Sequence, residues 1–337
     1  MNRIAGIVCL EKGCVPQAHD NQVRKMCSYF NNQKARIEKV ISTGTVCLAQ
    51  VNCNAISTVE ASVKRTKNFD LVCDGELYNR EEVELMLENS DTYGEHKDVD
   101  QLIGQGYEKL GKNIFAKLRG PIAIGIYDQR RDKFSLARDR FGEKRLYYSV
   151  SNGHLYFASE ISPVAKILPS LCINKRSLLE WTLYRNLLTG ESFFENVFVL
   201  PPGNMINVDK GRIELDAYFT PIAVIDEAKY QRFLGSSDEE VIDEIEKQIT
   251  YSVQDCVKER SDVGTFCSGG VDSSLVTALA AKSNEELISF HASDRRHSAY
   301  NELNYAQQVA ARLGVELECV DINKKIFQRE LARSIYV

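Results

Sequence analysis

Short apolar runs, several of them alternating with polar residues, fill the first half of the chain and are separated by turn residues. A run of this kind predicts a β-strand, because alternate side chains of a strand point to opposite faces of its sheet. Helical spacing also occurs there and predicts a few helices. Many strands with few helices indicate stacked antiparallel sheets with covering helices. The expected strands are Ile4–Leu10, Thr45–Val51, Phe69–Cys73, Ile122–Asp128, Lys133–Ala137, Leu146–Ser149 and Leu155–Ala158, and the expected helices are Asn21–Asn31, Arg80–Asn89 and Val99–Leu110.

The pattern changes near residue 226, after a short hairpin expected over Met205–Asn207 and Arg212–Leu215. Apolar residues at helical spacing predict a long amphipathic helix over Asp238–Val257. Strands and helices then alternate, which is typical of a doubly wound parallel sheet. We therefore expect two domains, over residues 1–205 and 226–337. Three strands and two or three helices cover little of a parallel sheet, so we expect the second domain to be the N-terminal part of a larger one. Its alternating elements are Val263–Cys267, Ser273–Lys282, Leu287–Ala292, Asn301–Leu313 and Val315–Ile322.

Charge and hydropathy exclude several classes of protein. The net charge is −5 and no basic run occurs, which argues against nucleic acid or an anionic membrane surface as the main partner. No apolar run approaches the roughly 20 residues of a membrane span. The first run, Ile4–Leu10, is followed at once by charged residues and lacks a signal-peptide cleavage site. We expect a cytoplasmic protein.

The cysteines are numerous but scattered. There are 10 of them, with no Cys-x-x-Cys pair and no histidine at metal-ligand spacing, which argues against a zinc site. Several lie inside apolar runs, and we expect these to be small buried side chains of a protein in a reducing compartment. They are Cys9, Cys47, Cys73, Cys267 and Cys319.

A glycine turn between a predicted strand and a predicted helix is the strongest chemical signal. It runs Cys267-Ser268-Gly269-Gly270-Val271-Asp272-Ser273. Glycines let the backbone approach an anion closely, and the amides at a helix start favour negative charge, so this layout predicts a phosphate cradle. No lysine follows the glycines, so the loop is not the type that binds β- and γ-phosphates through a lysine. It resembles the pyrophosphate loop of the ATP pyrophosphatase (PP-loop) superfamily.

Further motifs accompany this loop in a fixed order, and together they resemble the glutamine-dependent asparagine synthetase family over essentially the whole chain. The resemblance implies an N-terminal-nucleophile (Ntn) type glutaminase domain, a four-layer αββα sandwich, followed by a PP-loop α/β domain of Rossmann-like, doubly wound architecture. It also implies glutamine hydrolysis, transfer of ammonia, and amidation of aspartate activated as an acyl-adenylate. The motifs are Ile4–Val8, Asp74–Asn79, Arg138–Tyr148, Phe157–Glu160, Leu200–Gly203, Tyr300–Glu302 and Tyr305-Ala306.

The chain departs from this family where the glutaminase chemistry lies. Asn2 stands where the resemblance implies a nucleophilic cysteine, and an amide cannot become a nucleophile by losing a proton at neutral pH. Asn52 replaces the arginine that would pair with the glutamine carboxylate, and Asp74 replaces the asparagine that would donate to the oxyanion. Gly75, Glu76 and Asp98, the matches for the ammonium end of glutamine, are retained. We therefore expect no glutaminase activity.

The ATP-binding residues follow from the resemblance. Ser268, Gly269, Gly270, Asp272 and Ser273 would hold the pyrophosphate end of ATP, while Cys267 and Ala292 match the positions that flank adenine. Asp272 would lie near a Mg²⁺ ion that bridges the phosphates. Glu302 either faces the same cleft or serves only as an acidic helix start. The family's later acceptor loop and catalytic lysine have no match here.

The remaining candidate residues have simpler expected roles. His19, His96 and His154 lie in polar or turn-like contexts and are expected to be solvated, whereas His291 ends a strand near the presumed nucleotide. The sequence Arg138-Asp139-Arg140 is expected to form an internal ion-pair network at the domain interface.

The leading functional hypothesis is an asparagine-synthetase-like, ATP- and Mg²⁺-dependent amide ligase that takes a small amino-acid-like acceptor and has an inactive glutaminase site. One alternative is a ligase that closes an amide within one molecule, as β-lactam synthetases and lasso-peptide cyclases do. Another is a truncated, non-catalytic homologue that binds nucleotide or docks to an intact relative. A homodimer is expected only from the family resemblance.

Overall fold

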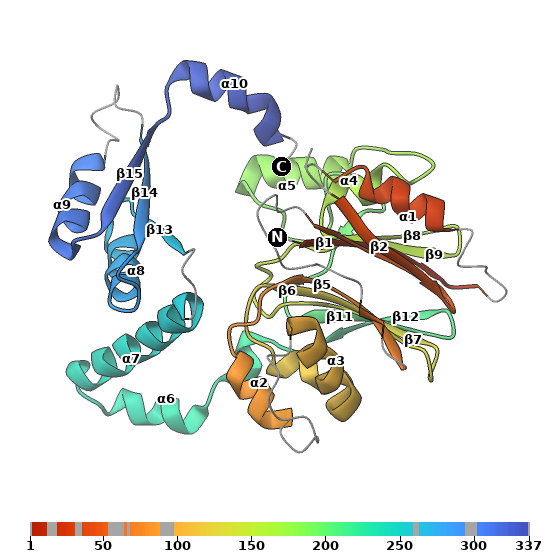
Figure 1. Ribbon diagram of the computed structural model, residues 1–337, viewed down its shortest axis with the longest axis horizontal. Coiled ribbons are helices and arrows are strands. Elements are labelled where there is room, and N and C mark those ends of the chain that lie inside the picture. The colour runs from red at the N-terminus through yellow and green to blue at the C-terminus, as the bar shows by residue number, and fades with distance from the viewer. Residues whose placement is uncertain are drawn as a thin grey trace. The chain divides into compact units, whose positions relative to one another are not determined.

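A computed structural model describes residues 2–11, 19–30, 36–52, 64–65, 68–87, 98–258, 263–293 and 302–335 of the chain (Figure 1). The chain divides into two compact units, Met1–Val224 and Ile225–Val337. The hairpin that follows residue 203 lies in the first unit, which therefore extends 19 residues beyond the range 1–205 expected from the sequence (224 − 205). Each unit is described by itself below.

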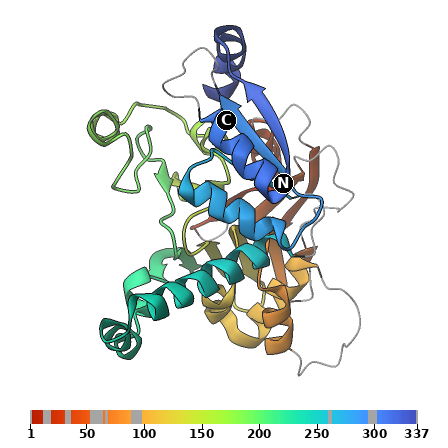
Figure 2. The same ribbon diagram turned by 90° about the vertical axis from the view of Figure 1, so that its left-hand side faces the viewer.

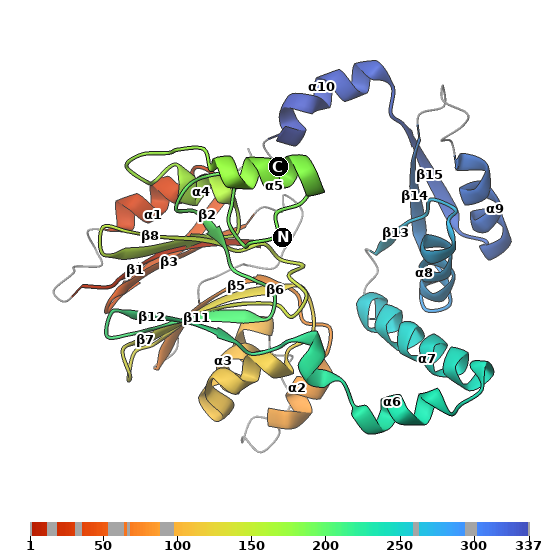
Figure 3. The ribbon, with the colours of Figure 1, turned by 180° about the vertical axis from the view of Figure 1, so that it is seen from behind.

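The first unit contains two six-stranded sheets whose strand pairs are antiparallel (Figure 3). Sheet A has the order β10-β8-β9-β1-β3-β2, and sheet B has the order β12-β11-β7-β6-β5-β4. The strands of sheet A are β1 (Asn2–Cys9), β2 (Arg36–Thr43), β3 (Val46–Asn52), β8 (Tyr147–Ser151), β9 (His154–Ala158) and β10 (Phe198–Val199). Those of sheet B are β4 (Lys64–Arg65), β5 (Phe69–Gly75), β6 (Ile122–Asp128), β7 (Lys133–Arg138), β11 (Asn204–Asp209) and β12 (Arg212–Ala217).

Three apolar clusters hold these sheets and their helices together. The first joins the facing sides of the two sheets, with Ile4 and Leu48 from sheet A and Val72 and Phe134 from sheet B. The second packs helices against the other side of sheet B, and the third does the same for sheet A. The helices on sheet B are α2 (Arg80–Leu87), α3 (Val99–Leu110) and the 3₁₀ helix η2 (Gly111–Lys117), and those on sheet A are α1 (Asp20–Cys27) and α4 (Ile161–Ala165).

Alternation along β1 explains why this strand can lie in the middle of the unit. Ile4 and Val8 face the other sheet, while Ala5 and Ile7 face the helices, and all four are buried. A Cβ on Gly6 would meet the ring of Phe157 at 2.5 Å, so the glycine leaves room for this ring to lie against β1.

Element prediction succeeded where the periodicity was strong. The predicted helices 99–110 and 238–257 and the strand 122–128 have the observed bounds. Predicted ends at Asn31, Asn89 and Asn301 lie outside the described residues. Strand β2 was missed because polar residues interrupt its sequence without strict alternation, so this edge strand has neither an apolar run nor a period of two. The sequence also did not predict β4, β10, α4, η2, η3 (Pro221–Val224), α6 (Glu227–Leu234) or α10 (Lys324–Ile335). A helix was expected at Trp181 and Tyr184, which lie on α5 (Lys175–Tyr184), but the expectation that both are core residues is wrong, because they are 40% and 61% exposed.

The second unit has a parallel three-stranded sheet in the order β13-β14-β15. Figure 2 shows helices α8 and α9 side by side over one face of this sheet, where Thr265, Ser289 and His291 are buried. On the opposite face Phe266 is 86% exposed and Phe290 is 40% exposed. The parallel sheet agrees with the sequence, and double winding stays a prediction. The elements are α7 (Asp238–Val257), β13 (Gly264–Phe266), α8 (Val271–Ala281), β14 (Ile288–Ser293), α9 (Leu303–Leu313) and β15 (Glu316–Asp321).

The cysteines agree with the sequence in part. Cys47, Cys73 and Cys267 are free and buried, as expected. Cys9 is also buried, but it is disulfide-bonded, so its description as a reduced apolar side chain is wrong. Sequence alone could not reveal this pairing, because a disulfide depends on which Cβ atoms the fold brings together. In the described part of the chain, no helix is long and apolar enough to cross a membrane.

Candidate functional sites

The glycine loop lies at the carboxyl edge of the parallel sheet, between β13 and α8. Gly270 is the N-cap residue of α8, and its backbone is extended just before the first helical turn. Ser268 Oγ accepts a hydrogen bond from Gly270 N at 3.2 Å and lies 3.0 Å from Ser273 Oγ. Ser273 Oγ accepts from Ser268 N at 3.2 Å. These bonds fold the loop back onto the start of α8, where helix amides favour an anion.

Gly269 is the position in the loop where no residue with a side chain fits. Its φ of +87° is unfavourable for residues with a side chain. A Cβ at this position would meet Tyr305 Cβ at 2.5 Å and Ala306 N at 2.6 Å, so the loop packs directly on helix α9. At Gly270, by contrast, a Cβ would meet only Ser268 Oγ, at 3.3 Å. The two adjacent glycines therefore have different roles, one in close packing and one at the open helix start.

A buried polar network supports the loop from below. Thr265 Oγ1 lies 2.7 Å from Ser289 Oγ and accepts from Thr277 Oγ1 at 3.2 Å, which ties β13, β14 and α8 together. His291 is 6% exposed, and its Nδ1 donates to the Cys267 carbonyl at 2.9 Å. The expected role of His291 near the nucleotide is therefore refined: it braces the backbone of the loop from inside the unit.

The other predicted ATP residues lie at the same edge or helix start. Asp272 is exposed in the first turn of α8, and Ala292 is exposed near the end of β14. Ser274 Oγ is buried and has no hydrogen-bond partner among the described residues. Glu302 is the exposed N-cap residue of α9, one turn before Tyr305, and its side chain caps no amide. A cradle with a constrained glycine, an orphaned hydroxyl and an exposed carboxylate fits a phosphate group accompanied by a cation.

Two of the three positions that depart from the family resemblance, Asn2 and Asn52, are neighbours. Asn2 begins β1 and lies directly opposite Asn52 at the end of β3. Asp74 lies on β5 in the facing sheet and is 1% exposed. The structure thus brings the three positions that the sequence singled out to one end of the space between the sheets.

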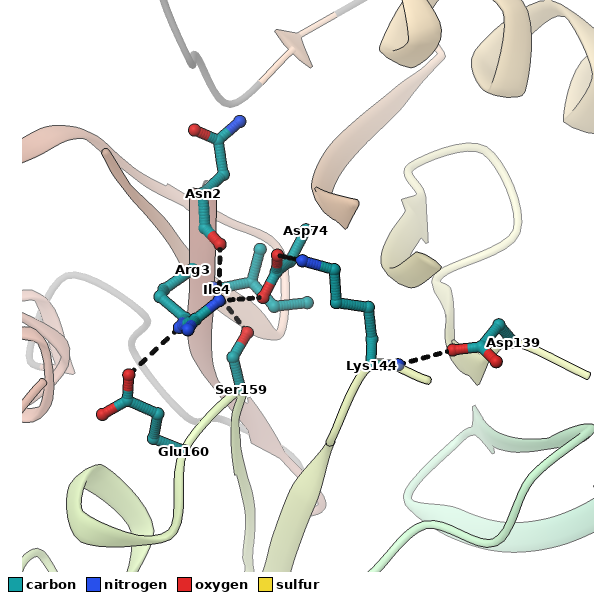
Figure 4. A network of polar contacts seen from close by, with 8 residues as sticks. All are labelled: Asn2, Arg3, Ile4, Asp74, Asp139, Lys144, Ser159 and Glu160. Carbon is teal, nitrogen blue, oxygen red and sulfur yellow. Dashed lines mark hydrogen bonds and ion pairs between the residues drawn. The ribbon is translucent and has the colours of Figure 1, made fainter. Parts of the chain in front are cut away.

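Asp74 is the centre of a charge cluster, shown in Figure 4. Its Oδ1 lies 2.9 Å from Lys144 Nζ, and its Oδ2 lies 3.5 Å from Arg3 Nη1. Arg3 Nε also donates to Glu160 Oε1 at 3.0 Å. Arg3, Lys144 and Glu160 were not predicted, because their roles depend on contacts between segments far apart in the sequence.

The loop that carries Lys144 is shaped by its polar neighbours. Asp139 accepts from the amides of Phe141, Glu143 and Lys144 at 3.2, 2.9 and 2.9 Å. The Arg138 guanidinium donates to three carbonyls, those of residues 142, 144 and 200, at 2.5, 2.5 and 2.7 Å.

The predicted ion-pair network at a domain interface is therefore wrong. Arg138 and Asp139 instead satisfy backbone groups of the loop, and burial lowers the pKa of Arg138. Arg140 also bonds a carbonyl, that of Ala116 at 2.6 Å.

The retained glutamine-pocket residues have structural roles in the described structure. Gly75 has a φ of +148°, and a Cβ there would meet the Pro121 carbonyl oxygen at 2.0 Å. The Glu76 amide donates to that same oxygen at 3.0 Å. Asp98 is the N-cap of α3, where Oδ1 accepts from Gln101 N at 2.8 Å within a capping box. These residues stabilise the local backbone of the first unit whether or not glutamine binds.

The cysteine next to Asp74 is not a candidate nucleophile. Cys73 precedes Asp74 on β5, and its side chain belongs to the cluster between sheet B and its helices. Burial raises the pKa of Cys73 well above its usual value, and the carboxylates of Asp100 and Asp74 add to that effect. A thiol held neutral in this way is a poor nucleophile.

This architecture defines a class of protein in which an amidotransferase-like unit is followed by an α/β unit that carries a glycine loop. Residues 4–219 match the family model described as a glutamine amidotransferase domain, which covers more than half of the chain. Residues 244–337 match the model described as asparagine synthase. The chain therefore belongs to the family of proteins with a glutamine amidotransferase domain.

Curated proteins named asparagine synthetase are similar to this chain over most of its length. The chain is 26% identical over 272 residues to asparagine synthetase (glutamine-hydrolyzing) 1 of Bacillus subtilis, covering 80% of this chain and 42% of that protein. It is 29% identical to putative asparagine synthetase (glutamine-hydrolyzing) 1 of Methanocaldococcus jannaschii, covering 77% and 43%. The chain thus spans about two fifths of the length of these curated relatives. Among solved structures, glutamine phosphoribosylpyrophosphate amidotransferase of B. subtilis aligns with a TM-score of 0.42 and 12% identity, covering 97% of this chain and 70% of that one.

Proposed function

We propose that the chain is an asparagine-synthetase-like ligase that activates an aspartate-type acceptor as an acyl-adenylate, with loss of pyrophosphate, and that does not hydrolyse glutamine. Free ammonia or another amine is then the nitrogen donor. The proposal includes an Ntn-type four-layer first domain and a doubly wound PP-loop second domain. The observation that carries the loss of glutaminase activity is the buried charge cluster around Asp74.

Each altered position removes one part of thioester chemistry. Asn2 offers an amide in place of an attacking thiolate. An ionised Asp74 can only accept hydrogen bonds, so it cannot donate to a developing oxyanion. Asn52 provides no bidentate cation for the carboxylate of glutamine. Lys144 and Arg3 are already paired with Asp74, which supports a pocket organised around its own charges.

Nucleotide binding is supported by the loop residues. The start of α8 and the hydroxyls of Ser268 and Ser273 suit the phosphates, and Asp272 would help to hold the accompanying Mg²⁺. Bound ATP supplies the pyrophosphate leaving group for adenylation. Gly269 and His291 keep the loop backbone in place, which orients these donors.

Two measurements test the proposal. With Mg²⁺, aspartate and ammonia, the protein is expected to catalyse exchange of labelled pyrophosphate into ATP. Gly269→Ala should abolish that exchange and weaken binding of a fluorescent ATP analogue, because its Cβ collides with α9. Gly270→Ala is the matched control and should retain binding, since only a serine hydroxyl must shift.

Glutamine should release no glutamate above background. Asn2→Cys alone should not restore hydrolysis, because Asp74 and Asn52 remain. Glutamate release that a glutamine-analogue alkylator blocks would contradict the loss of this activity. Nucleotide binding without any exchange would contradict the ligase and favour a non-catalytic homologue.

A further inference from the structure

The ends of three elements meet on the helix-covered side of sheet A, away from the charge cluster around Asp74. Cys9 at the end of β1 lies directly opposite His154 at the start of β9. Two residues along each strand, Ile7 and Tyr156 belong to the apolar cluster beneath α1 and α4, so Cys9 and His154 point to the same face. His19, the N-cap residue of α1, stands over them.

The two imidazoles are oriented toward each other. His154 Nε2 lies 3.2 Å from His19 Nε2. On its other side, His154 Nδ1 lies 2.6 Å from the Asn152 carbonyl, which can only accept, so Nδ1 carries the proton. His19 Nδ1 lies 2.9 Å from Gln22 Oε1, an acceptor in the same way. In the neutral rings both Nε2 lone pairs therefore point into one space.

The arrangement of the two histidines fits a metal site better than a hydrogen-bonded pair. When both Nε2 atoms are acceptors, neither can donate a hydrogen bond to the other, and a cation between them relieves the repulsion of their lone pairs. Histidines that bind metals commonly donate their second nitrogen to a carbonyl or carboxylate, as both rings do here. Two nitrogens at about 2.05 Å from a tetrahedral zinc ion are separated by about 3.3 Å, close to the observed 3.2 Å.

Cys9 supplies the third ligand position. Its sulfur and the two histidine nitrogens lie within 4.8 Å of one another. A tetrahedral site with a Zn–S bond of about 2.3 Å requires sulfur–nitrogen separations of about 3.6 Å, so a shift of the sulfur by about 1.3 Å or less is enough. It is 3% exposed and disulfide-bonded, and a disulfide sulfur is not the thiolate that zinc requires.

We propose that Cys9, His19 and His154 form a Zn²⁺ site that opens when the disulfide of Cys9 is reduced. A dithiol reductant breaks the S–S bond, donates two electrons and two protons, and becomes a disulfide itself, which leaves Cys9 and its partner as thiols. Zn²⁺ then binds the two Nε2 atoms and the Cys9 sulfur, and the thiol proton passes to solvent. The site lies outside both the nucleotide loop and the altered glutamine pocket, so it couples redox state to metal content independently of ligase chemistry.

Co²⁺ is the probe, because it adopts zinc geometry and shows a thiolate charge-transfer band in the near ultraviolet. The full chain, reduced with dithiothreitol and desalted without oxygen, is titrated with Co²⁺ and then with Zn²⁺. The reduced protein is expected to show the band with one equivalent of Co²⁺ and to lose it on adding Zn²⁺, while the oxidised protein shows none. Cys9→Ser, His19→Gln and His154→Gln should each abolish the band, whereas Cys172→Ser, at an exposed free cysteine, should retain it.

Gln22→Ala keeps every ligand and lies on the exposed side of α1, so its folding is not at risk. It should weaken Co²⁺ binding by about 10–100-fold, the usual cost of losing a residue that orients a ligand. Far-ultraviolet circular dichroism checks the fold of each variant. The proposal is overturned if the band appears in oxidised protein, persists in folded histidine variants, is missing from reduced protein, or has the same affinity in Gln22→Ala.

Discussion

The ion pair between Asp74 and Lys144 allows a direct measurement of how strongly the stability of the first unit depends on the buried charges around Asp74. Asp74 is 1% exposed and Lys144 is 13% exposed at a separation of 2.9 Å. Removing one partner of a buried pair leaves the other charge desolvated and costs about 3–5 kcal/mol. Because Arg3 stays near Asp74 and Lys144 retains some solvent contact, we expect the lower end, about 3 kcal/mol, for Lys144→Met and for Asp74→Asn.

A double-mutant cycle separates the pair from its surroundings. The protein's only tryptophan, Trp181, lies in the first unit, so its fluorescence during urea unfolding follows that unit. Each single variant should lower the urea midpoint by roughly 1 M. The loss of unfolding free energy in the double variant should be smaller than the sum of the losses in the two single variants, by about 1–3 kcal/mol.

The control is the partly exposed pair of Arg80 and Glu84 on α2, 3.0 Å apart. Glu84→Gln should change stability by only about 0.3–0.5 kcal/mol. If the Asp74 and Lys144 effects add within about 0.5 kcal/mol, the two charges are not coupled and the reasoning fails.

Three further outcomes follow from the same principles. Burial, followed by the Asp132 carboxylate, raises the pKa of Tyr127 from 10.0 to about 12. Since the unfolded state loses this proton first, the stability of the protein should fall as the pH rises from 10 towards 12. Tyr127→Phe should make that fall shallower when unfolding by urea is measured at a series of alkaline pH values. Iodoacetamide at pH 8 should modify the exposed Cys172 and leave Cys73 unmodified until urea unfolds the chain, which peptide mass spectrometry measures. Ser237→Ala, which removes the capping box of α7, should destabilise the second unit by about 1 kcal/mol, as followed by circular dichroism, and an unchanged midpoint would show that the cap contributes nothing.

Local patterns predicted much of the fold because the forces that they report are local. The helix over 238–257 and the strand over 122–128 have strong periodicity and were predicted to the residue. The glycine turn was recognised because a strand, two glycines and a helix start are contiguous in sequence. Strand β2 has no apolar run, and its place at a sheet edge follows from pairing with β3 alone.

By itself, the sequence predicted the family resemblance, the order of the two parts, and the residues expected to stand in place of a nucleophile, a carboxylate clamp and an oxyanion donor. Only the tertiary structure decided that Lys144 and Arg3 close on Asp74, and that Cys9, His19 and His154 converge at the ends of three elements. The physical reason is that ion pairs and metal ligands act over a few ångströms, whereas most of these residues are separated by dozens of positions along the chain. Strand register and sheet packing create such contacts, and neither can be predicted from the sequence spacing of the residues that come into contact.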